Sequence, residues 1–273
     1  MAKVAITGIT GLVGGHVADA LEKAGHVVVG VSRQATSKPT GRLIHMVSDL
    51  TDPQALTSAL EGCDIIFHFA DRADRKSYTD ENVDTAARML AALRKAAAVT
   101  GVDRIVAASS VYAEKVTQPD DRYGRSKLAM EAVGMAETLG GHVLILRLPP
   151  LHGPKAKGAV RHIERAVTKG WPLPFGLATA PRRFLSLDAL ADLCERLIRL
   201  KDETFASAAG QIWYPSSAHQ DSLLALTKSV GHRHPWLLPV PGIDRLISGR
   251  VSLGQLESER TALLAATGWQ ALD

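Results

Sequence analysis

Short apolar runs alternate with helix-like stretches along the first half of the chain, and this alternation predicts the fold. Six runs are short and apolar enough to be buried parallel strands; they cover residues 3–7, 26–32, 43–50, 64–70, 104–110 and 142–148. The stretches between several of them have the periodicity or composition of helices. Repeated strand–helix units with short links predict an α/β fold, a Rossmann-like doubly wound parallel sheet with right-handed crossovers.

Start and stop signals delimit the predicted helices. Four residues share one apolar helical face after the first strand, and a glycine stop follows them: Val13, Val17, Leu21, Ala24 and then Gly25. The second helix begins with Asp52 as N-cap and Pro53 at its first position. Two further helices are predicted over residues 85–98 and 123–140.

The pattern changes after residue 154. The chain becomes richer in proline and histidine, and its elements are expected to be irregular, as in KGWPLPFG, YPSSAHQD and HRHPWLLPVPG. We expect residues 1–150 to form a dinucleotide-binding domain. Residues 151–273 are expected to form mainly a smaller C-terminal substrate-binding lobe over the carboxyl edge of the sheet, with some elements returning to the first domain.

Composition narrows the class of protein. Of 273 residues, 46% are hydrophobic, yet no apolar run approaches the roughly 18 residues of a membrane span, and the N-terminus leaves no room for a signal peptide. Cys63 and Cys194 are expected to be buried, reduced thiols rather than metal ligands, which predicts a cytoplasmic protein without a metal or membrane partner. The net charge of +4 is scattered, which suits an anionic small molecule, and no nucleic-acid motif accompanies it.

A glycine-rich turn joins the first strand to the first helix. Glycines recur every third residue at Gly8, Gly11 and Gly14. Glycine tolerates a positive φ and lets a phosphate approach the backbone, and the helix N-terminus beyond offers free N–H groups. The turn, with its intervening Thr10, Leu12 and Val13, is therefore predicted to bind a pyrophosphate. The alternative is a glycine turn used only for tight packing.

The end of the second strand discriminates between dinucleotides. An acid about 20 residues beyond the glycines would bind the ribose hydroxyls of NAD. This chain has Ser32 and Arg33 there, and Arg33 can pair with a 2′-phosphate, so NADP(H) is favoured over NAD(H). The alternative is a solvated surface arginine. Asp49 and Leu50, after the third strand, are expected to contact the adenine.

A tyrosine–lysine pair supplies the candidate chemistry. Of the four tyrosines, only Tyr123 is followed by a lysine at the helical i+4 position, Lys127. A neighbouring ammonium favours the phenolate and lowers the phenol pKa. Ser109 and Ser110 end the fifth strand at the same edge, where a hydroxyl can orient a carbonyl oxygen. The alternative is a surface Tyr–Lys contact.

Several motifs in order resemble one family. The chain is similar to an extended short-chain dehydrogenase/reductase of the NAD-dependent epimerase/dehydratase family in its segments TGITGLVG, SDL, FHFA, NVDTAARML, VAASS, YGRSK and RRFLSLDALAD. The resemblance implies that Tyr123 is the general acid/base, that Lys127 holds the nicotinamide ribose, and that Ser110 rather than Ser109 binds the reacting oxygen. It also implies further cofactor contacts from Phe69, Ala70, Pro149 and Pro150.

A narrower resemblance concerns the substrate. The segments LRLPPLHGPKAKG, KGWPLPFG, LLPVP and LLAATGW resemble bacterial nucleotide-sugar reductases that act on UDP-4-keto-6-deoxy-N-acetylhexosamines. This implies that Arg182 pairs with the nucleotide diphosphate and that Ser110 and His152 contact the substrate. The chain departs from that pattern in two shortened loops, after FHFA and after Ser110, and in His152, which stands where tyrosine or phenylalanine is usual.

Three functions stay open on the sequence. The first is NADP(H)-dependent reduction of a carbonyl in a nucleotide sugar or related polar ketone by a Ser-Tyr-Lys mechanism. The second is a nucleotide-sugar epimerase that retains NAD, and the third is a non-catalytic dinucleotide-binding sensor or scaffold. The resemblance also implies a homodimer built from the helices that follow NVDT and YGRSK.

Overall fold

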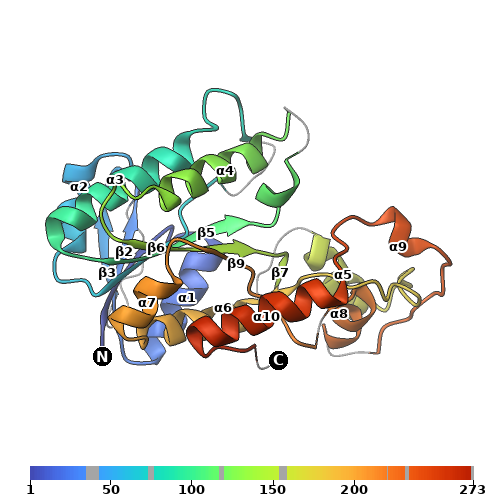
Figure 1. Ribbon diagram of the computed structural model, residues 1–273. Helices are drawn as coiled ribbons and strands as arrows, with labels where there is room; N and C mark the ends of the chain where they lie inside the picture. Colours follow the sequence, from blue (N-terminus) through green and yellow to red (C-terminus); the bar gives the residue numbers. More distant parts are fainter. Residues whose placement is uncertain are drawn as a thin grey trace. The chain divides into compact units, whose positions relative to one another are not determined.

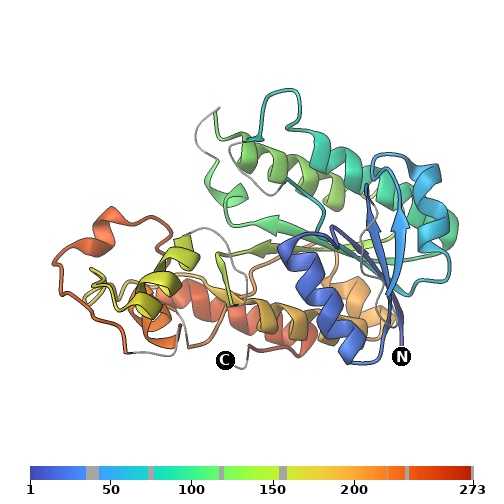
Figure 2. The same ribbon diagram turned by 180° about the vertical axis from the view of Figure 1, so that it is seen from behind.

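The computed structural model describes residues 1–34, 43–72, 77–116, 120–153, 159–219, 221–230 and 234–271 (Figures 1 and 2). The two shortened loops lie partly outside these residues. The chain divides into two units, the first formed by Met1–Arg147 with Cys194–Trp213 and the second by Leu148–Leu193 with Tyr214–Asp273. Within the described chain, every helix is too short or too polar to cross a membrane.

A seven-stranded parallel sheet forms the centre of the first unit, in the order β3-β2-β1-β4-β5-β6-β9. Its strands are β1 Lys3–Thr7, β2 Val27–Ser32, β3 Leu43–Val47, β4 Ile65–His68, β5 Arg104–Ser110, β6 His142–Leu148 and β9 Ile212–Trp213. The order reverses between β1 and β4, and Thr7 lies opposite both Val31 and His68. Ligands of doubly wound sheets bind at such a reversal, beyond the carboxyl ends of the strands.

Helices cover both faces of this sheet. On one face lie α2 Pro53–Leu60, α3 Thr85–Thr100 and α4 Arg122–Met135, and on the other lie α1 Leu12–Lys23 and α7 Asp202–Ala208 (Figures 1 and 2). All four residues of β4 are buried, as expected for a strand covered on both faces. The alanine-rich α3 packs closely between α2 and α4, because small side chains let the helix axes approach.

Most predicted elements of this unit are confirmed. The strands at residues 3–7, 104–110 and 142–148 match at both ends. Asp52 caps α2, accepting a hydrogen bond of 2.9 Å from the N–H of Gln54. Cys63 and Cys194 are buried free thiols. The prediction for Ala24 is wrong: Ala24 is the exposed C-cap of α1, because the chain turns away at Gly25 with φ 93°.

Several elements of the first unit differ from the sequence prediction: β3 and β4 end earlier, at Val47 and His68, and α7 was not predicted. The seventh strand, β9, was missed because it is only two residues long, too short to show a hydrophobic pattern typical of a strand. The prediction also extends α4 to residue 140, whereas the helix ends at Met135 and Ala136 is extended. The segment beyond Ala136 instead turns so that its carbonyls meet a buried cation, Arg94 of α3.

The second unit contains β7 Leu151–His152 paired with β8 Leu185–Ser186. Its helices are α5 Ala159–Lys169, α8 Leu223–Ser229, α9 Ile243–Leu246 and α10 Leu253–Thr267, while α6 Leu187–Ile198 leads back into the first unit. Apolar residues of α5 and α8 form its core with Leu173 and Phe184. The prediction of irregular elements is wrong for much of this unit, because the proline-rich stretches are connections and regular helices lie between them.

Arg94 holds the end of α4 in place. The Arg94 side chain is buried. In the part of the chain that the structure describes, all hydrogen bonds of its guanidinium go to backbone carbonyls, which belong to Val133, Gly134, Ala136, Leu139, Gly140 and Gly141. Carbonyls at a helix C-terminus carry the negative end of the helix dipole and otherwise lack partners. The cation therefore caps α4 and shapes the turn into β6 at once.

We expect Arg94→Met to destabilise the protein by about 2–4 kcal/mol, because it removes the donor shared by several part-buried carbonyls. Urea unfolding followed by circular dichroism measures the loss. Lys95→Met is the matched control, since Lys95 is the exposed next residue of the same helix. Equal stability of the two variants would contradict the capping role.

Candidate active site

The glycine turn after β1 packs tightly against neighbouring backbone. Gly8 has φ +75°, and a Cβ built on it would lie 2.7 Å from the backbone nitrogen of Ala70. A Cβ on Gly14 would lie 2.3 Å from the Gly8 carbonyl oxygen. Glycine is therefore required at both positions, so that the turn can pack against the segment after β4 and against α1.

The N-terminus of α1 faces this turn with its N–H groups available. Gly11 is the N-cap, no side chain of the described residues caps it, and the first turn contains no acidic residue. The N–H of Gly11 is bonded back to the Gly8 carbonyl at 2.8 Å, which closes the turn. Uncapped N–H groups and the positive end of the helix dipole suit a pyrophosphate, so these residues fit a dinucleotide.

The ends of β2 and β3 contain the predicted adenosine contacts. The Ser32 hydroxyl donates to the Gln34 carbonyl at 2.7 Å and lies 2.8 Å from His45 Nε2, so it is held within the protein. Arg33 is exposed, while Leu50 is buried. The exposed Asp49 carboxylate accepts hydrogen bonds from the backbone and hydroxyl of Thr51, which, with a smaller effect of the Arg33 charge, lower its pKa.

The segment after β4 is tied to β1. Thr7 accepts a hydrogen bond of 3.3 Å from the Ala70 N–H, and its hydroxyl lies 2.8 Å from His68 Nδ1. Burial, reinforced by the Lys127 charge, lowers the pKa of His68 to about 4, so its ring is neutral near pH 7. Phe69 and Ala70, the predicted cofactor contacts, thus have a fixed path beside Gly8.

Tyr123 and Lys127 are presented by the first turns of α4. Asp121 caps this helix by accepting from the Gly124 N–H at 3.0 Å. Gly124 is needed there, because a Cβ would lie 2.6 Å from a methyl carbon of Val116. Lys127 is buried, with its Nζ 5.9 Å from the centre of the Tyr123 ring, so the helical i+4 spacing brings the pair together as predicted.

The two serines at the end of β5 have different surroundings. Ser109 donates to Glu131, whose carboxylate also forms an ion pair of 2.7 Å with Arg147. Its hydroxyl therefore belongs to a buried polar cluster. The Ser110 hydroxyl instead accepts from the N–H of Tyr112 at 3.3 Å, and the Tyr112 ring lies 6.0 Å from that of Tyr123. Ser110 thus lies in the same neighbourhood as Tyr123.

Sequence reasoning missed an acidic neighbour of the lysine. Asp71 lies 2.6 Å from Lys127 Nζ, and Tyr78 donates a hydrogen bond to the same carboxylate. The Tyr78 ring packs edge-on against Tyr123, with centroids 5.3 Å apart. A signal for Asp71 was present, since it follows FHFA at the carboxyl end of a buried strand. No spacing pattern could have identified Tyr78.

The remaining predicted residues belong to the second unit. Pro149 is buried and Pro150 exposed, directly before β7, and His152 is buried in β7 opposite Ser186. Arg182 is also buried; it pairs with Asp244 at 2.7 Å and donates to three carbonyls, those of Ala180, Ile247 and Ser248. Its predicted role toward a diphosphate stays a prediction.

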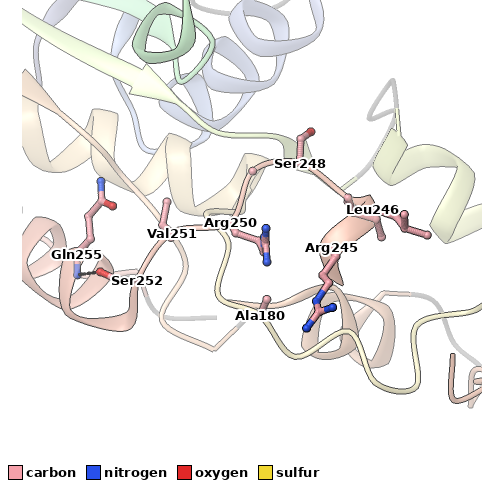
Figure 3. A pocket seen from close by; sticks show the side chains of 10 residues that line it. Ala180, Arg245, Leu246, Ser248, Arg250, Val251, Ser252 and Gln255 are labelled. Atoms are coloured by element: carbon pink, nitrogen blue, oxygen red, sulfur yellow. Dashed lines mark hydrogen bonds between the residues drawn. The ribbon is translucent and has the colours of Figure 1, made fainter. Parts of the chain in front are cut away.

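A cavity of about 810 Å³ lies in the second unit, beside the segment that Arg182 holds (Figure 3). It is lined by Ala180, Arg245, Leu246, Ile247, Ser248, Gly249, Arg250, Val251, Ser252 and Gln255. Two arginines and two hydroxyl groups among these residues make the lining suitable for an anionic group. Within the described residues, no cluster of His, Cys, Asp and Glu could hold a metal ion.

Several curated proteins are similar in sequence to this chain. The UDP-glucose 4-epimerase of Vibrio cholerae is 29% identical over 264 residues, which cover 87% of this chain and 78% of the relative. The 2-alkyl-3-oxoalkanoate reductase of Shewanella oneidensis is 36% identical over 94 residues, but these cover only 33% of this chain and 24% of that enzyme. The relatives therefore include both epimerases and reductases.

Solved structures share the fold. The Bordetella bronchiseptica enzyme WbmG, in complex with NAD and UDP, superimposes with a TM-score of 0.67 at 20% identity, covering 100% of this chain and 90% of that one. The sequence profile of the NAD dependent epimerase/dehydratase family matches residues 4–208, which include the glycine turn, Ser110, Tyr123 and Lys127. The chain belongs to this family of extended short-chain dehydrogenase/reductase enzymes, which use a nicotinamide dinucleotide.

Proposed function

We propose that the protein is an NADP(H)-dependent oxidoreductase that reduces a carbonyl of a nucleotide sugar, of the UDP-4-keto-6-deoxyhexosamine type, or of a related polar ketone. The observation that carries this proposal is the Tyr123–Lys127 pair on α4. Ser110, at the end of β5, lies in the same neighbourhood. A non-catalytic sensor would not need this pair. The proposed form is a homodimer, consistent with the exposed apolar side chains of Val99, Leu128 and Met135 on α3 and α4.

The proposed mechanism assigns one proton transfer to this chain. A nicotinamide dinucleotide, which the glycine turn and Lys127 would hold, would supply the hydride chemistry for the carbonyl carbon when bound. Tyr123 donates its phenolic proton to the carbonyl oxygen, which completes the alcohol, and the phenolate is then reprotonated from solvent. Ser110 donates a hydrogen bond to the same oxygen, where negative charge develops. Lys127 binds the nicotinamide ribose and stabilises the transient phenolate.

The cofactor preference rests on Arg33. Arg33 is exposed directly after β2, and the described residues that end this strand, Ser32, Arg33 and Gln34, include no acid to receive ribose hydroxyls. An arginine binds a phosphate with up to two parallel hydrogen bonds, whereas it gains less from a neutral hydroxyl. This favours the phosphorylated dinucleotide.

The substrate class rests on the second unit and on the relatives. The cavity lined by Arg245 and Arg250 suits a diphosphate, and Arg182 and His152 are proposed as further substrate contacts. The names of the relatives point the same way, since they include a UDP-glucose 4-epimerase and a structure with bound UDP. Together these favour a UDP-linked substrate.

Epimerisation is the second candidate, because the longest of these sequence matches is to an epimerase. An epimerase returns the hydride to the same carbon and shows no net oxidation of its cofactor. Purified protein that retains a stoichiometric dinucleotide would favour this candidate. Release of the cofactor during purification is expected of the reductase.

Mixing the purified protein with NADPH and a freshly generated UDP-4-keto-6-deoxy-N-acetylhexosamine tests the proposal. We expect nicotinamide absorbance to fall rapidly, and more slowly with NADH. Steady absorbance in the presence of both dinucleotides, together with epimerisation of an added UDP-sugar, would instead assign the epimerase.

Tyr123→Phe should lower the rate of reduction by about 10²–10⁴-fold, because it removes the proton donor. Dinucleotide affinity, measured by fluorescence quenching, should change little. Tyr214→Phe is the matched control, since Tyr214 belongs to the second unit and lies under the Arg183 guanidinium. Substantial turnover by the Tyr123 variant would remove it from the mechanism.

Arg33→Ala should lower kcat/KM for NADPH by about 10–100-fold, the loss expected for one charge-assisted contact, and leave that for NADH nearly unchanged. Steady-state kinetics with each dinucleotide provides the measurement. Arg88→Ala serves as control, because Arg88 is an exposed arginine on α3. Equal losses with both dinucleotides would contradict recognition of a 2′-phosphate.

A further inference from the structure

Asp71 is in direct contact with the catalytic lysine. Its carboxylate lies 2.6 Å from Lys127 Nζ, and both side chains are largely buried, with 14% and 6% of their surfaces exposed. Lys127 donates a second hydrogen bond, of 3.0 Å, to the Ala108 carbonyl on β5. An ammonium has three protons, so these two contacts fix the direction of the third.

The carboxylate is itself held in place. Tyr78 and the Arg72 N–H donate hydrogen bonds to it. Burial acts to raise the pKa of Asp71, but the Lys127 charge and these donors overcome it and hold the pKa below its usual value. Burial likewise acts to lower the pKa of Lys127, but Asp71, together with Tyr123 and Glu131, overcomes this effect and raises the pKa. Near pH 7 both groups are therefore charged.

Other ionisable groups near Lys127 do not replace this effect. Glu131, one turn further along α4, is already paired with Arg147 on β6 and bonded to Ser109. His68 on β4 is neutral near pH 7. Tyr78 and Tyr112 flank the Tyr123 ring, and burial together with the Asp71 charge raises the pKa of Tyr78. Asp71 is thus the carboxylate that directly offsets the ammonium among the described residues.

Offsetting the ammonium changes its effect on Tyr123. A lone buried ammonium stabilises the phenolate strongly, since charges interact strongly at low effective dielectric constant. An ion pair acts as a dipole, and its field is weaker and falls off faster. The pair therefore stabilises a neighbouring phenolate less than a lone ammonium would.

We propose that Asp71 is a positioning residue that fixes Lys127 and offsets its charge, so that Tyr123 keeps its proton at neutral pH and serves as a proton donor. This rests on the proposed function, because it favours the direction of carbonyl reduction. In the opposite direction Tyr123 must first lose its proton to act as a base. The sign follows from charge: loss of a negative group near Tyr123 makes the phenolate easier to form.

Absorbance titration of the tyrosines tests this without turnover. The chain has four tyrosines, and replacing Asp71 also changes the titration of Tyr78, so Tyr123 is isolated by subtracting the titration of Tyr123→Phe made in the same background as each variant. In Asp71→Asn we expect the titration midpoint of the Tyr123 phenol to fall by about 1 pH unit or more. Asp71→Glu keeps the charge and should restore a midpoint near that of the unmodified protein. An unchanged midpoint in Asp71→Asn overturns the proposal.

A second comparison covers the case in which Asp71→Asn does not fold. Lys127→Met leaves the carboxylate alone, and the double variant Lys127→Met with Asp71→Asn removes both charges of the buried pair, a change that proteins often tolerate. The Tyr123 midpoint should be lower in the double variant than in Lys127→Met. Equal midpoints overturn the proposal.

The pH profile of reduction separates this inference from the proposed function. Activity at high pH should be lost at a lower pH in Asp71→Asn, by the same shift as in the titration. Asp80→Asn is the control, because Asp80 is an exposed carboxylate paired with Arg122 and Arg125 at the start of α4, and it should shift neither curve. A shifted titration in a protein that reduces no ketone overturns the reductase assignment and supports the role of Asp71. A Tyr123 titration that does not shift in Asp71→Asn overturns the proposed role of Asp71, whether or not the protein reduces a ketone.

Discussion

The parallel pairing of β1 with β4 is the constraint on which the site depends. Because Thr7 lies opposite His68, the turn after β1 and the segment after β4 leave the sheet side by side. Gly8 can then approach Ala70 so closely that no side chain fits between them, and Asp71 follows immediately. The close packing of the glycine turn against Ala70 and the lysine–aspartate pair are therefore consequences of a single register. A shift of one residue would separate both, since the side chains of β4 would exchange faces of the sheet.

Buried cations mark the places where this unit departs from a simple apolar core. Each has a different counterpart: the carbonyls at the end of α4 for Arg94, Glu131 for Arg147, and Asp71 for Lys127. A buried charge without a partner is costly, so each pairing restricts how the neighbouring segments can pack. Arg94 binds carbonyls at the end of α4 and in the turn before β6, whereas Arg147 ties β6 to the middle of α4 through Glu131. Lys127 lies at the carboxyl edge, where the same requirement for a partner also changes the reactivity of a tyrosine.

Much of the first unit could be predicted from sequence because its signals are local. Apolar runs, the Asp52–Pro53 start of α2 and the i+4 spacing of Tyr123 and Lys127 each depend on residues close together in the chain. What could not be predicted depends on distant contacts. The early end of α4 follows from Arg94, some forty residues away, and β9 exists only because β6 offers it an edge. Asp71 was visible as an acid after a strand, but its pairing with Lys127 requires the sheet order, which brings β4 beside β5.

The protonation of one tyrosine separates the two chemistries that the relatives represent. An epimerase must remove a proton and return one within each turnover, so its tyrosine is most useful with a pKa close to the working pH. A reductase only donates, and solvent restores the proton afterwards, so its tyrosine must be protonated at the start of each turnover, although a higher pKa also makes the phenol a weaker acid. A lysine with a free charge suits the first requirement, and a lysine paired with a buried carboxylate suits the second. Under the role proposed for Asp71, its pairing with Lys127 is consistent with reduction on grounds separate from Arg33, which bears only on the choice of dinucleotide.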